Sequence, residues 1–249
     1  MTGAPDMASV APGRPVALVT GSCGGIGRAI VKALSDDGMR VAGADVAPAP
    51  GGEAELELRA DVSRPGDCAG AVRQVLQRLS RLDVVVSAAG VNLRQPFAAM
   101  DAGRARALFD VNVWGAVNIL QASHEALAAS PCASVVVITS TSGHLGFRNS
   151  SGYAMSKMAL TGLVRSLAVE WAGHPVRVNA VAPAIVPTAM NAEVREQAGY
   201  LDKKLERIPL RRVIEASEVA AAVAFLAGPR GSGITGVTLN VDGGAIVMG

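Results

Sequence analysis

Short apolar runs alternate with longer amphipathic stretches along most of the chain. Seven runs are rich in aliphatic residues and short enough to be strands, and they occupy residues 16–20, 40–44, 55–60, 83–86, 135–139, 176–182 and 237–241. Between them, apolar residues recur three or four positions apart, which predicts helices over residues 28–37, 65–80, 101–129, 153–172 and 218–227. This order predicts one doubly wound α/β domain with a seven-stranded parallel sheet.

Three segments do not fit this alternation. Residues 1–14 are rich in small residues, Pro and Gly, so we expect a disordered tail before a domain that spans residues 15–249. Residues 46–52 contain too much Pro and Gly for the helix expected at that crossover, and a loop is predicted instead. Residues 189–212 are mixed and polar, as is typical of a substrate loop, and Ser217 is expected to cap the helix that follows.

Composition narrows the class of protein. Half of the 249 residues are apolar and only 3% are aromatic, so the core is expected to be aliphatic. The net charge is +2 without a basic run, which argues against nucleic acid as a partner. No apolar run reaches the roughly 18 residues of a membrane span, and the N-terminus lacks a signal-peptide pattern, so a cytoplasmic protein without a membrane partner is expected. The cysteines and histidines lack disulfide or metal-ligand spacing, so no metal site is predicted.

A glycine-rich turn joins the first predicted strand to the first helix. It reads Gly21-Ser22-Cys23-Gly24-Gly25-Ile26-Gly27. Such a turn lets the backbone approach a pyrophosphate, while the helix N-terminus supplies N–H donors. Its spacing differs from the common dinucleotide fingerprint, so a plain glycine turn is the alternative. The Cys23 thiol is either a small loop residue or a group whose oxidation would block pyrophosphate binding.

Asp45 ends the second predicted strand, about 20 residues after the glycine turn. A carboxylate at this position accepts hydrogen bonds from the adenosine ribose hydroxyls and repels a 2′-phosphate. Gly24 adds no cation beside the turn. Both features favour NAD over NADP, and the alternative for Asp45 is a solvated turn carboxylate.

Further candidates for cofactor contact follow the next two strands. Asp61 and Val62 are placed to meet an adenine ring. The small residues Ala88, Ala89 and Gly90 would allow a cofactor to lie against the backbone. These positions extend the predicted dinucleotide site across several strand ends.

Four polar residues are the candidates for chemistry. Tyr153 and Lys157 are four positions apart at the start of a predicted helix, so they share one face. A phenol with a pKa of about 10 is a weak acid or base at neutral pH, and a nearby ammonium lowers that pKa. Ser140 ends a predicted strand, where its hydroxyl faces the ligand crevice. Asn112 lies on the apolar face of a predicted helix and is either a satisfied core amide or part of a site.

Taken together, these motifs resemble the short-chain dehydrogenase/reductase family from residue 16 to the C-terminus. The resemblance rests on Thr20-Gly21-x-x-x-Gly25-x-Gly27, Asp61, Ala88-Ala89-Gly90, Asn112, Ser140, Tyr153-x-x-x-Lys157 and Pro183-x-x-x-x-Thr188. It implies an extended Rossmann fold, a homotetramer, and NAD-dependent interconversion of a secondary alcohol and a ketone. The four-residue step from tyrosine to lysine argues against the family's enoyl-reductase branch, which spaces them more widely.

The resemblance also implies a role for each matched residue. Tyr153 would be the acid/base, and Lys157 would lower its pKa and bond the nicotinamide ribose. Ser140 would hold the substrate oxygen, and Asn112 would anchor a water in a proton relay. Contacts to the nicotinamide carboxamide fall to Thr188 and to the backbone near Pro183 and Val186.

The chain departs from the family pattern at three places. Ser87 stands where the family usually has Asn, which changes how the cofactor loop is braced. Ala184 replaces a usual Gly, so its backbone should avoid positive φ or carry strain. The missing second crossover helix shortens the adenine side.

The substrate is the least constrained part of the prediction. The candidate contacts are Arg94, Ser142, Arg148 and Ser150. The two arginines suggest a polyol, sugar or hydroxy-acid substrate, unless both are solvated surface residues. An NADPH-dependent 3-oxoacyl-[acyl-carrier-protein] reductase is the alternative enzyme, and a non-catalytic NAD-binding protein is the alternative outside enzymology.

Overall fold

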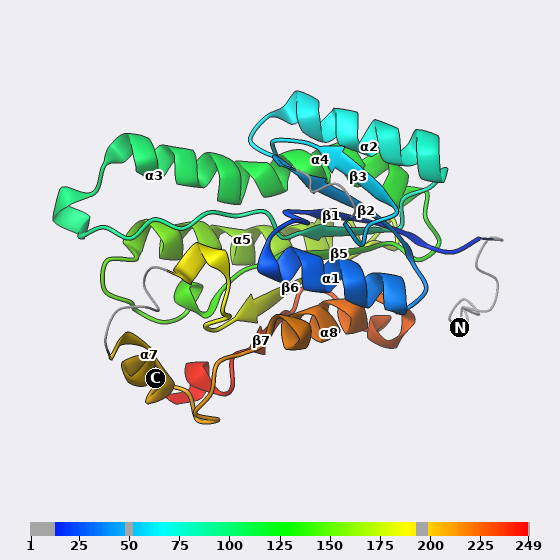
Figure 1. The fold of residues 1–249 in the computed structure, drawn as a ribbon. Helices are drawn as coiled ribbons and strands as arrows, with labels where there is room; N and C mark the ends of the chain where they lie inside the picture. Colours follow the sequence, from blue (N-terminus) through cyan, green and yellow to red (C-terminus); the bar gives the residue numbers. More distant parts are fainter. Residues whose placement is uncertain (1–12, 48–51, 193–198, 249) are drawn as a thin grey trace.

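A computed structural model describes residues 13–47, 52–192 and 199–248, and its centre is a seven-stranded sheet (Figure 1). All strands pair in parallel in the order β3-β2-β1-β4-β5-β6-β7. Their bounds are β1 (Val16–Thr20), β2 (Arg40–Asp45), β3 (Leu56–Arg59), β4 (Val84–Ser87), β5 (Ser134–Ile138), β6 (Arg177–Pro183) and β7 (Thr238–Val241). The prediction of a single doubly wound α/β domain with a seven-stranded parallel sheet is confirmed.

Helices cover both faces of the sheet (Figure 1). One face packs against α1 (Gly25–Asp36) and α8 (Ala216–Ala227), and the other against α2 (Pro65–Leu79), α4 (Gly115–Ala128) and α5 (Ser151–Glu170). β1 shows why the central strands are mostly apolar, because Ala17 and Val19 join the core on the α1 side while Val16 and Leu18 join the core on the other side. A strand buried on both faces needs continuous rather than alternating hydrophobicity.

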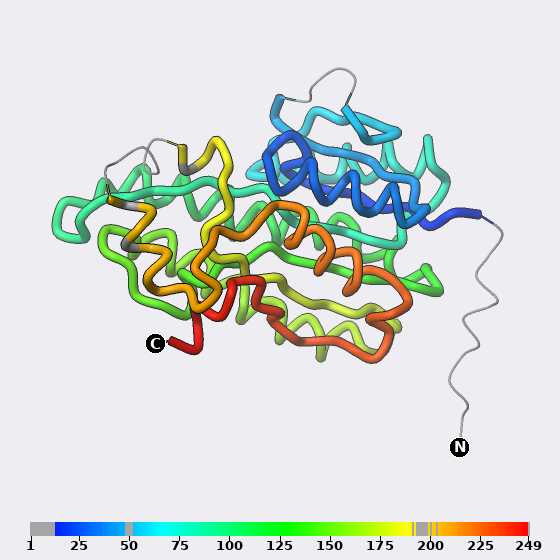
Figure 2. Tube along the Cα trace, turned by 60° about the horizontal axis from the view of Figure 1, so that its bottom comes forward, coloured from blue at the N-terminus to red at the C-terminus, as the bar shows by residue number. Residues whose placement is uncertain are grey.

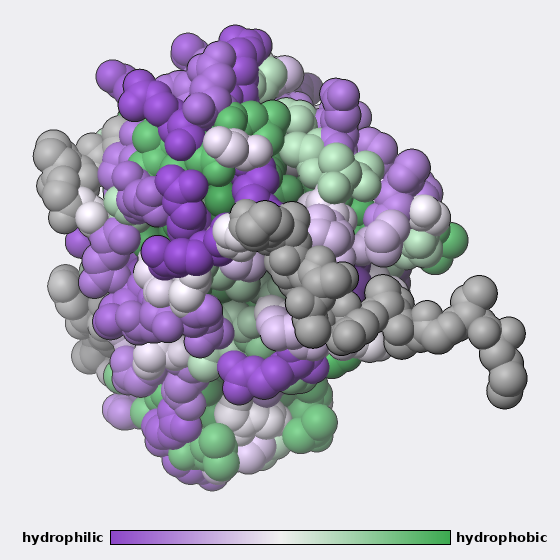
Figure 3. All heavy atoms as spheres, turned by 90° about the vertical axis from the view of Figure 1, so that its right-hand side faces the viewer, coloured by the Kyte–Doolittle hydropathy of each residue, from purple (hydrophilic) through white to green (hydrophobic). Residues whose placement is uncertain are grey.

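The strands begin on the side of the molecule where the N-terminal segment enters β1, which faces the viewer in Figure 3. Hydrophilic side chains cover most of this side, and hydrophobic ones form several separate areas. The carboxyl ends lie at the opposite edge of the sheet. There Thr20, the last residue of β1, is level with Ala44 on β2 and Ser87 on β4.

The predicted helix over residues 101–129 is interrupted. The structure has α3 (Ala102–Phe109), a π-helical turn (Asp110–Trp114) and then α4. Such turns are frequent at functional sites. Here the turn contains Asn112, whose side chain is buried, while Trp114 is exposed.

Two other local predictions are corrected. The N-cap of α8 is Glu215 rather than Ser217, because Glu215 N donates to the Glu218 carboxylate at 2.9 Å and so completes a capping arrangement. The segment predicted as a loop over residues 189–212 contains a short 3-10 turn (Ala189–Asn191) and α7 (Tyr200–Leu205), and residues 193–198 lie outside the described part.

Other predictions fall partly outside the described residues. The tail predicted over residues 1–14 does so for residues 1–12, and the crossover loop does so for residues 48–51. The described residues on either side of that gap, 46–47 and 52–55, are not helical. No helix in the described part is long and apolar enough to cross a membrane.

Candidate active site

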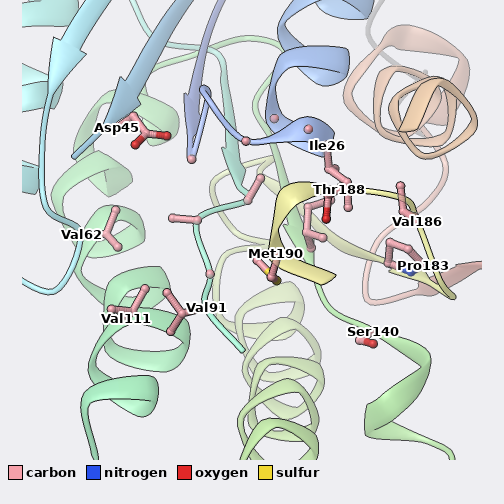
Figure 4. A pocket seen from close by; sticks show the side chains of 18 of the residues that line it. Ile26, Asp45, Val62, Val91, Val111, Ser140, Pro183, Val186, Thr188 and Met190 are labelled. Carbon is pink, nitrogen blue, oxygen red and sulfur yellow. The ribbon is translucent and has the colours of Figure 1, made fainter. Parts of the chain in front are cut away.

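A cavity of about 350 Å³ lies at the carboxyl edge of the sheet, beside the ends of β1 and β4. The strand order reverses between these two strands, which is the place where open parallel sheets bind ligands. The cavity brings together most of the residues that the sequence predicts: Gly21, Gly25, Ile26, Gly27, Asp45, Asp61, Val62, Ala88, Ala89, Gly90, Ser140, Tyr153, Lys157, Pro183, Val186 and Thr188. Figure 4 shows Asp45 and Ser140 toward opposite ends of it, with Met190 between them in the view.

The glycine turn is shaped by close backbone contacts. Gly21 has a φ of +68°, and a Cβ there would lie 2.7 Å from Ala89 Cα, so the turn lies against the strand-end residues. A Cβ on Gly25 would lie 2.8 Å from Thr188 Cγ2. The turn therefore leads into the N-terminus of α1 with its backbone accessible, an arrangement that fits a pyrophosphate.

Asp45 is held in place by the glycine turn itself. Its Oδ2 accepts a 3.0 Å hydrogen bond from Cys23 N, and its Oδ1 accepts one from Ala47 N at 3.3 Å. Cys23 thus acts through its backbone, and its half-buried side chain lies outside the cavity lining. The half-buried carboxylate at the edge of the cavity fits the hydroxyls of an adenosine ribose.

A second carboxylate, on Glu57, lies behind Asp45. Glu57 is opposite Gly43 in the sheet register, and a Cβ on Gly43 would lie 3.0 Å from Glu57 Oε2 and 2.8 Å from Ser22 Oγ. Burial raises the pKa of Glu57, a hydrogen bond with the backbone of Ala54 opposes this, and the charge of Asp45 adds to the rise. Sequence analysis missed Glu57, because the cross-strand register that places it is not visible in local spacing.

Thr20 braces the strand-end residues on the other side of the turn. Its hydroxyl oxygen accepts hydrogen bonds from Ala88 N at 3.2 Å and from Ala89 N at 3.3 Å. This buried contact supports the segment after Ser87, the residue that departs from the family pattern. Ala184, the second departure, is not among the described non-glycine residues with positive φ, so its backbone avoids that region as expected.

Asn112 connects the segment after β4 to α5. Its Oδ1 accepts from Val91 N at 2.8 Å, and its Nδ2 donates to Val91 O at 3.0 Å and to Ser156 Oγ at 3.1 Å. The side chain lies outside the cavity lining, whereas Val91 is part of it. Of the two interpretations that the sequence left open, these contacts favour a satisfied core amide that positions a wall of the site.

Ser140 and Tyr153 form the polar centre of the cavity. Ser140 Oγ accepts a 3.1 Å hydrogen bond from Ser142 N and also hydrogen bonds with the Tyr153 side chain. Burial raises the pKa of the Tyr153 phenol, and the hydrogen bond with Ser140 partly offsets that rise. Both residues line the same cavity, so both hydroxyls are placed to contact a substrate oxygen there.

Lys157 is buried, and its Nζ donates a 2.9 Å hydrogen bond to the carbonyl oxygen of Ile138. Burial lowers the pKa of Lys157 to about 8. Its Nζ lies 5.7 Å from the centroid of the Tyr153 ring. Burial thus acts on both groups, raising the pKa of the Tyr153 phenol and disfavouring the charge of Lys157; the lowering of the tyrosine pKa by Lys157 stays a prediction.

Several predicted residues do not line the cavity. Besides Cys23 and Asn112, these are Ser22, Arg94, Ser142, Arg148 and Ser150. Ser142 contributes its backbone N–H to Ser140, whereas Arg94 and Arg148 are exposed. The cavity also has lining residues that sequence analysis did not assign to the site: Gly24, Ala44, Val46, Ala60, Val111, Ile138, Thr139 and Ala184. Among the described residues, no group of three or more His, Cys, Asp or Glu side chains is arranged to hold a metal.

Comparison with known proteins identifies the family. A family model described as Enoyl-(Acyl carrier protein) reductase matches residues 21–245. The chain belongs to the short-chain dehydrogenase/reductase family. An uncharacterized short-chain type dehydrogenase/reductase of Sinorhizobium fredii is 41% identical, and the match covers 96% of this chain and 45% of that protein. The chain thus spans less than half of that relative's length.

Solved structures of the family have the same fold. The ligand-free aldohexose dehydrogenase of Thermoplasma acidophilum has a TM-score of 0.86 and 32% identity, with 94% of each chain covered. A gluconate 5-dehydrogenase from Burkholderia cenocepacia, in complex with NADP and tartrate, has a TM-score of 0.88 and 26% identity, with 94% of this chain and 95% of that chain covered. As a short-chain dehydrogenase/reductase, this protein is an oxidoreductase of a family that binds nicotinamide cofactors.

Proposed function

We propose that this protein interconverts a secondary alcohol and a ketone with NAD as its cofactor. The observation that carries the proposal is that Ser140, Tyr153 and Lys157 line the same cavity as the glycine turn and Asp45. The polar side chains supply acid–base chemistry, and the turn and carboxylate fit a dinucleotide. A non-catalytic NAD-binding protein would not need Ser140, Tyr153 and Lys157 in the same cavity.

The residues divide the work of the reaction. Bound nicotinamide supplies the hydride acceptor in one direction and the donor in the other. Tyr153 takes the proton from the alcohol hydroxyl, or returns it to the carbonyl oxygen in the reverse direction. Ser140 hydrogen bonds the same substrate oxygen, because Ser142 N fixes its hydroxyl at the strand end. Lys157 is mostly charged at neutral pH and would bond the nicotinamide ribose.

The remaining roles follow the geometry of the cavity. Asn112 would position the wall at Val91 through its backbone hydrogen bonds, and the water relay implied by the family stays a prediction. Thr188, in contact with the glycine turn at Gly25, and the backbone near Val186 would bind the carboxamide.

The preference for NAD rests on charge at the adenosine end. Asp45 lies at the cavity edge, where its carboxylate would repel a 2′-phosphate. The gluconate 5-dehydrogenase structure contains NADP, which keeps an NADP-dependent enzyme as the alternative. The alternative that the sequence offers is an NADPH-dependent 3-oxoacyl-[acyl-carrier-protein] reductase. Comparing kcat/KM for NAD and NADP in the wild type and in Asp45→Ala separates the two, because the NAD-dependent enzyme should lose its preference in the variant.

The proposed activity is tested by a screen of secondary alcohols and hydroxy acids with NAD reduction as the readout. Turnover of at least one class supports the proposal, and NAD binding without turnover of any compound in a wide panel contradicts it.

The further proposal of a homotetramer is supported by exposed apolar side chains on α5, namely Met155, Met158 and Val169. Light scattering of the purified protein measures the assembly.

A further inference from the structure

A glycine at the start of α4 is in close contact with one residue of the cavity wall. Gly115 is the buried first residue of α4, and a Cβ on it would lie 2.6 Å from Val62 Cγ2 and 3.1 Å from Val62 Cβ. Val62 follows β3 and lines the cavity. Both distances are shorter than the roughly 3.5 Å at which carbon atoms pack. Position 115 therefore accommodates no side chain unless Val62 moves.

Val62 is also held through its backbone. Its carbonyl oxygen accepts a 2.9 Å hydrogen bond from Asn118 Nδ2 and a longer one, 3.5 Å, from Cys68 Sγ on α2. Asn118 comes three positions after Gly115 in α4, so the two residues share one face of that helix. Two contacts from this face thus fix Val62, one at its side chain and one at its carbonyl oxygen.

The open side of Val62 is the cavity. Val62 belongs to the same apolar core as Cys68, Ala116 and Ile119, and it also lines the cavity. A closely packed core has little free volume to take up a displacement. A side chain at position 115 would therefore push Val62 toward the cavity, where space is available.

Val62 borders the end of the cavity that we assign to adenosine. Asp45 fits the ribose hydroxyls, and Figure 4 shows Val62 between Asp45 and Val111 in the view. Val111 comes from the π-helical turn that leads into α4, and it lines the cavity as well. Apolar side chains from two elements at this end suit a flat aromatic ring such as adenine.

We propose that Gly115 and Asn118 are positioning residues for the adenine ring of the cofactor. Gly115 leaves room for the Val62 side chain, and Asn118 holds the Val62 carbonyl oxygen. Neither residue lines the cavity, so both act through Val62. The inference rests on the proposed dehydrogenase function, and it applies to an adenine dinucleotide with or without a 2′-phosphate.

The kinetic test exchanges bulk between Gly115 and Val62. Gly115→Ala should raise KM for the cofactor roughly tenfold, because the displaced Val62 narrows the space for adenine, while kcat stays within about twofold. In a Val62→Ala background the same substitution should change KM by less than about twofold, since the added methyl group then has room. Gly70→Ala in α2, where a Cβ would meet no atom within 4 Å, is the control and should leave KM unchanged.

A binding test separates this inference from the proposed activity. Titration calorimetry uses ADP-ribose, which carries adenosine and pyrophosphate but no nicotinamide. Gly115→Ala should weaken ADP-ribose binding roughly tenfold, and Asn118→Ala, which adds no bulk, should weaken it several-fold through the lost hydrogen bond to the Val62 carbonyl oxygen. Urea unfolding measures the stability of each variant in parallel.

Three results would overturn the inference. They are unchanged ADP-ribose affinity in Gly115→Ala, an equal loss of affinity from Gly115→Ala with Val62 and with Ala at position 62, and a wild type that does not bind ADP-ribose. Binding that follows the expected pattern in a protein that turns over no alcohol would instead count against the proposed function alone.

Discussion

Lys157 Nζ donates a 2.9 Å hydrogen bond to the carbonyl oxygen of Ile138, the last residue of β5. This contact joins α5, which carries Tyr153 and Lys157, to the strand that Ser140 follows. It also fixes a buried ammonium group in a cavity wall, where burial lowers the pKa of Lys157 to about 8. Burial of this charge is unfavourable for stability, which fits the proposal that the ammonium group is kept for cofactor binding.

Replacing Lys157 by Met should therefore stabilise the protein while abolishing turnover. The folded-state pKa of about 8 lies below the ordinary 10.5, so the stability linked to this group is present above pH 10.5 and lost as pH falls through about 8. At pH 7 removal of the charge should raise the free energy of unfolding by up to about 3 kcal/mol, less the lost hydrogen bond to Ile138. Urea unfolding without cofactor at pH 7 measures this, and a less stable variant would contradict the account.

Ser140→Ala should shift the pH dependence of alcohol oxidation to higher pH. The hydrogen bond from Ser140 partly offsets the rise that burial imposes on the Tyr153 pKa, so its removal leaves that pKa higher still. Oxidation needs the deprotonated phenol as base, and the rising limb of kcat/KM against pH should move to more alkaline values. Ser142→Ala, which keeps the backbone N–H to Ser140, is the matched control, and identical profiles for both variants would refute this role.

Glu57→Gln should raise the melting temperature at neutral pH. Because burial raises the pKa of Glu57, the stability linked to this group is full below about pH 4.5 and lost as pH rises through the folded-state pKa. Glutamine removes the buried charge behind Asp45, where Oε2 finds no hydrogen-bond partner among the described residues. The gain should shrink toward pH 4. The exposed Glu53→Gln is the control and should leave the melting temperature nearly unchanged at both pH values.

Asp83 lies at the amino end of β4, on the side of the sheet opposite the cavity. Its replacement should lower the free energy of unfolding. Burial tends to raise the pKa of Asp83, but hydrogen bonds from Arg81, Ser130 and Val16 N outweigh it and lower that pKa. Stability linked to this group is thus lost as pH falls through its folded-state pKa. Asp83→Asn should cost about 3 kcal/mol or more, because it breaks a buried ion pair.

The control for Asp83 is the exposed pair of Arg212 and Glu218, which are 2.7 Å apart. Glu218→Gln should have a much smaller effect, since exposed ion pairs contribute little. Urea unfolding of both variants at pH 7 and pH 4 makes the comparison. Equal losses of unfolding free energy in the two variants would show that the buried Asp83 pair contributes no more to stability than the exposed pair.

The features that the sequence predicted correctly are those that depend on short-range residue patterns. The glycine turn and the Tyr153 and Lys157 pair each depend on residues a few positions apart, and Asp45 depends on the end of an apolar run. The structure places all of them at one cavity. The seven strands followed from short apolar runs, and the central strands β1, β4 and β5 are fully buried.

What the sequence could not predict depends on contacts between distant segments. Thr20 supports Ala88 and Ala89 across a strand pair, and the half-buried Glu57 lies opposite Gly43 in the sheet register. The π-helical turn at Asn112 contains no proline or glycine that would predict an interruption of the helix. The partners of the Asn112 amide, Val91 and Ser156, lie elsewhere in the chain, so local spacing does not reveal them. Burial by the surrounding residues raises the Tyr153 pKa, and the spacing of Tyr153 and Lys157 alone does not reveal that burial.

The central claim is that Tyr153 exchanges the proton of the substrate oxygen beside Ser140. The most direct test is kcat for alcohol oxidation by Tyr153→Phe, with cofactor affinity measured in parallel by fluorescence titration. The account predicts that kcat falls roughly a hundred- to ten-thousandfold while cofactor affinity stays within a few-fold of the wild type. Turnover that survives undiminished in a variant that still binds cofactor would contradict it.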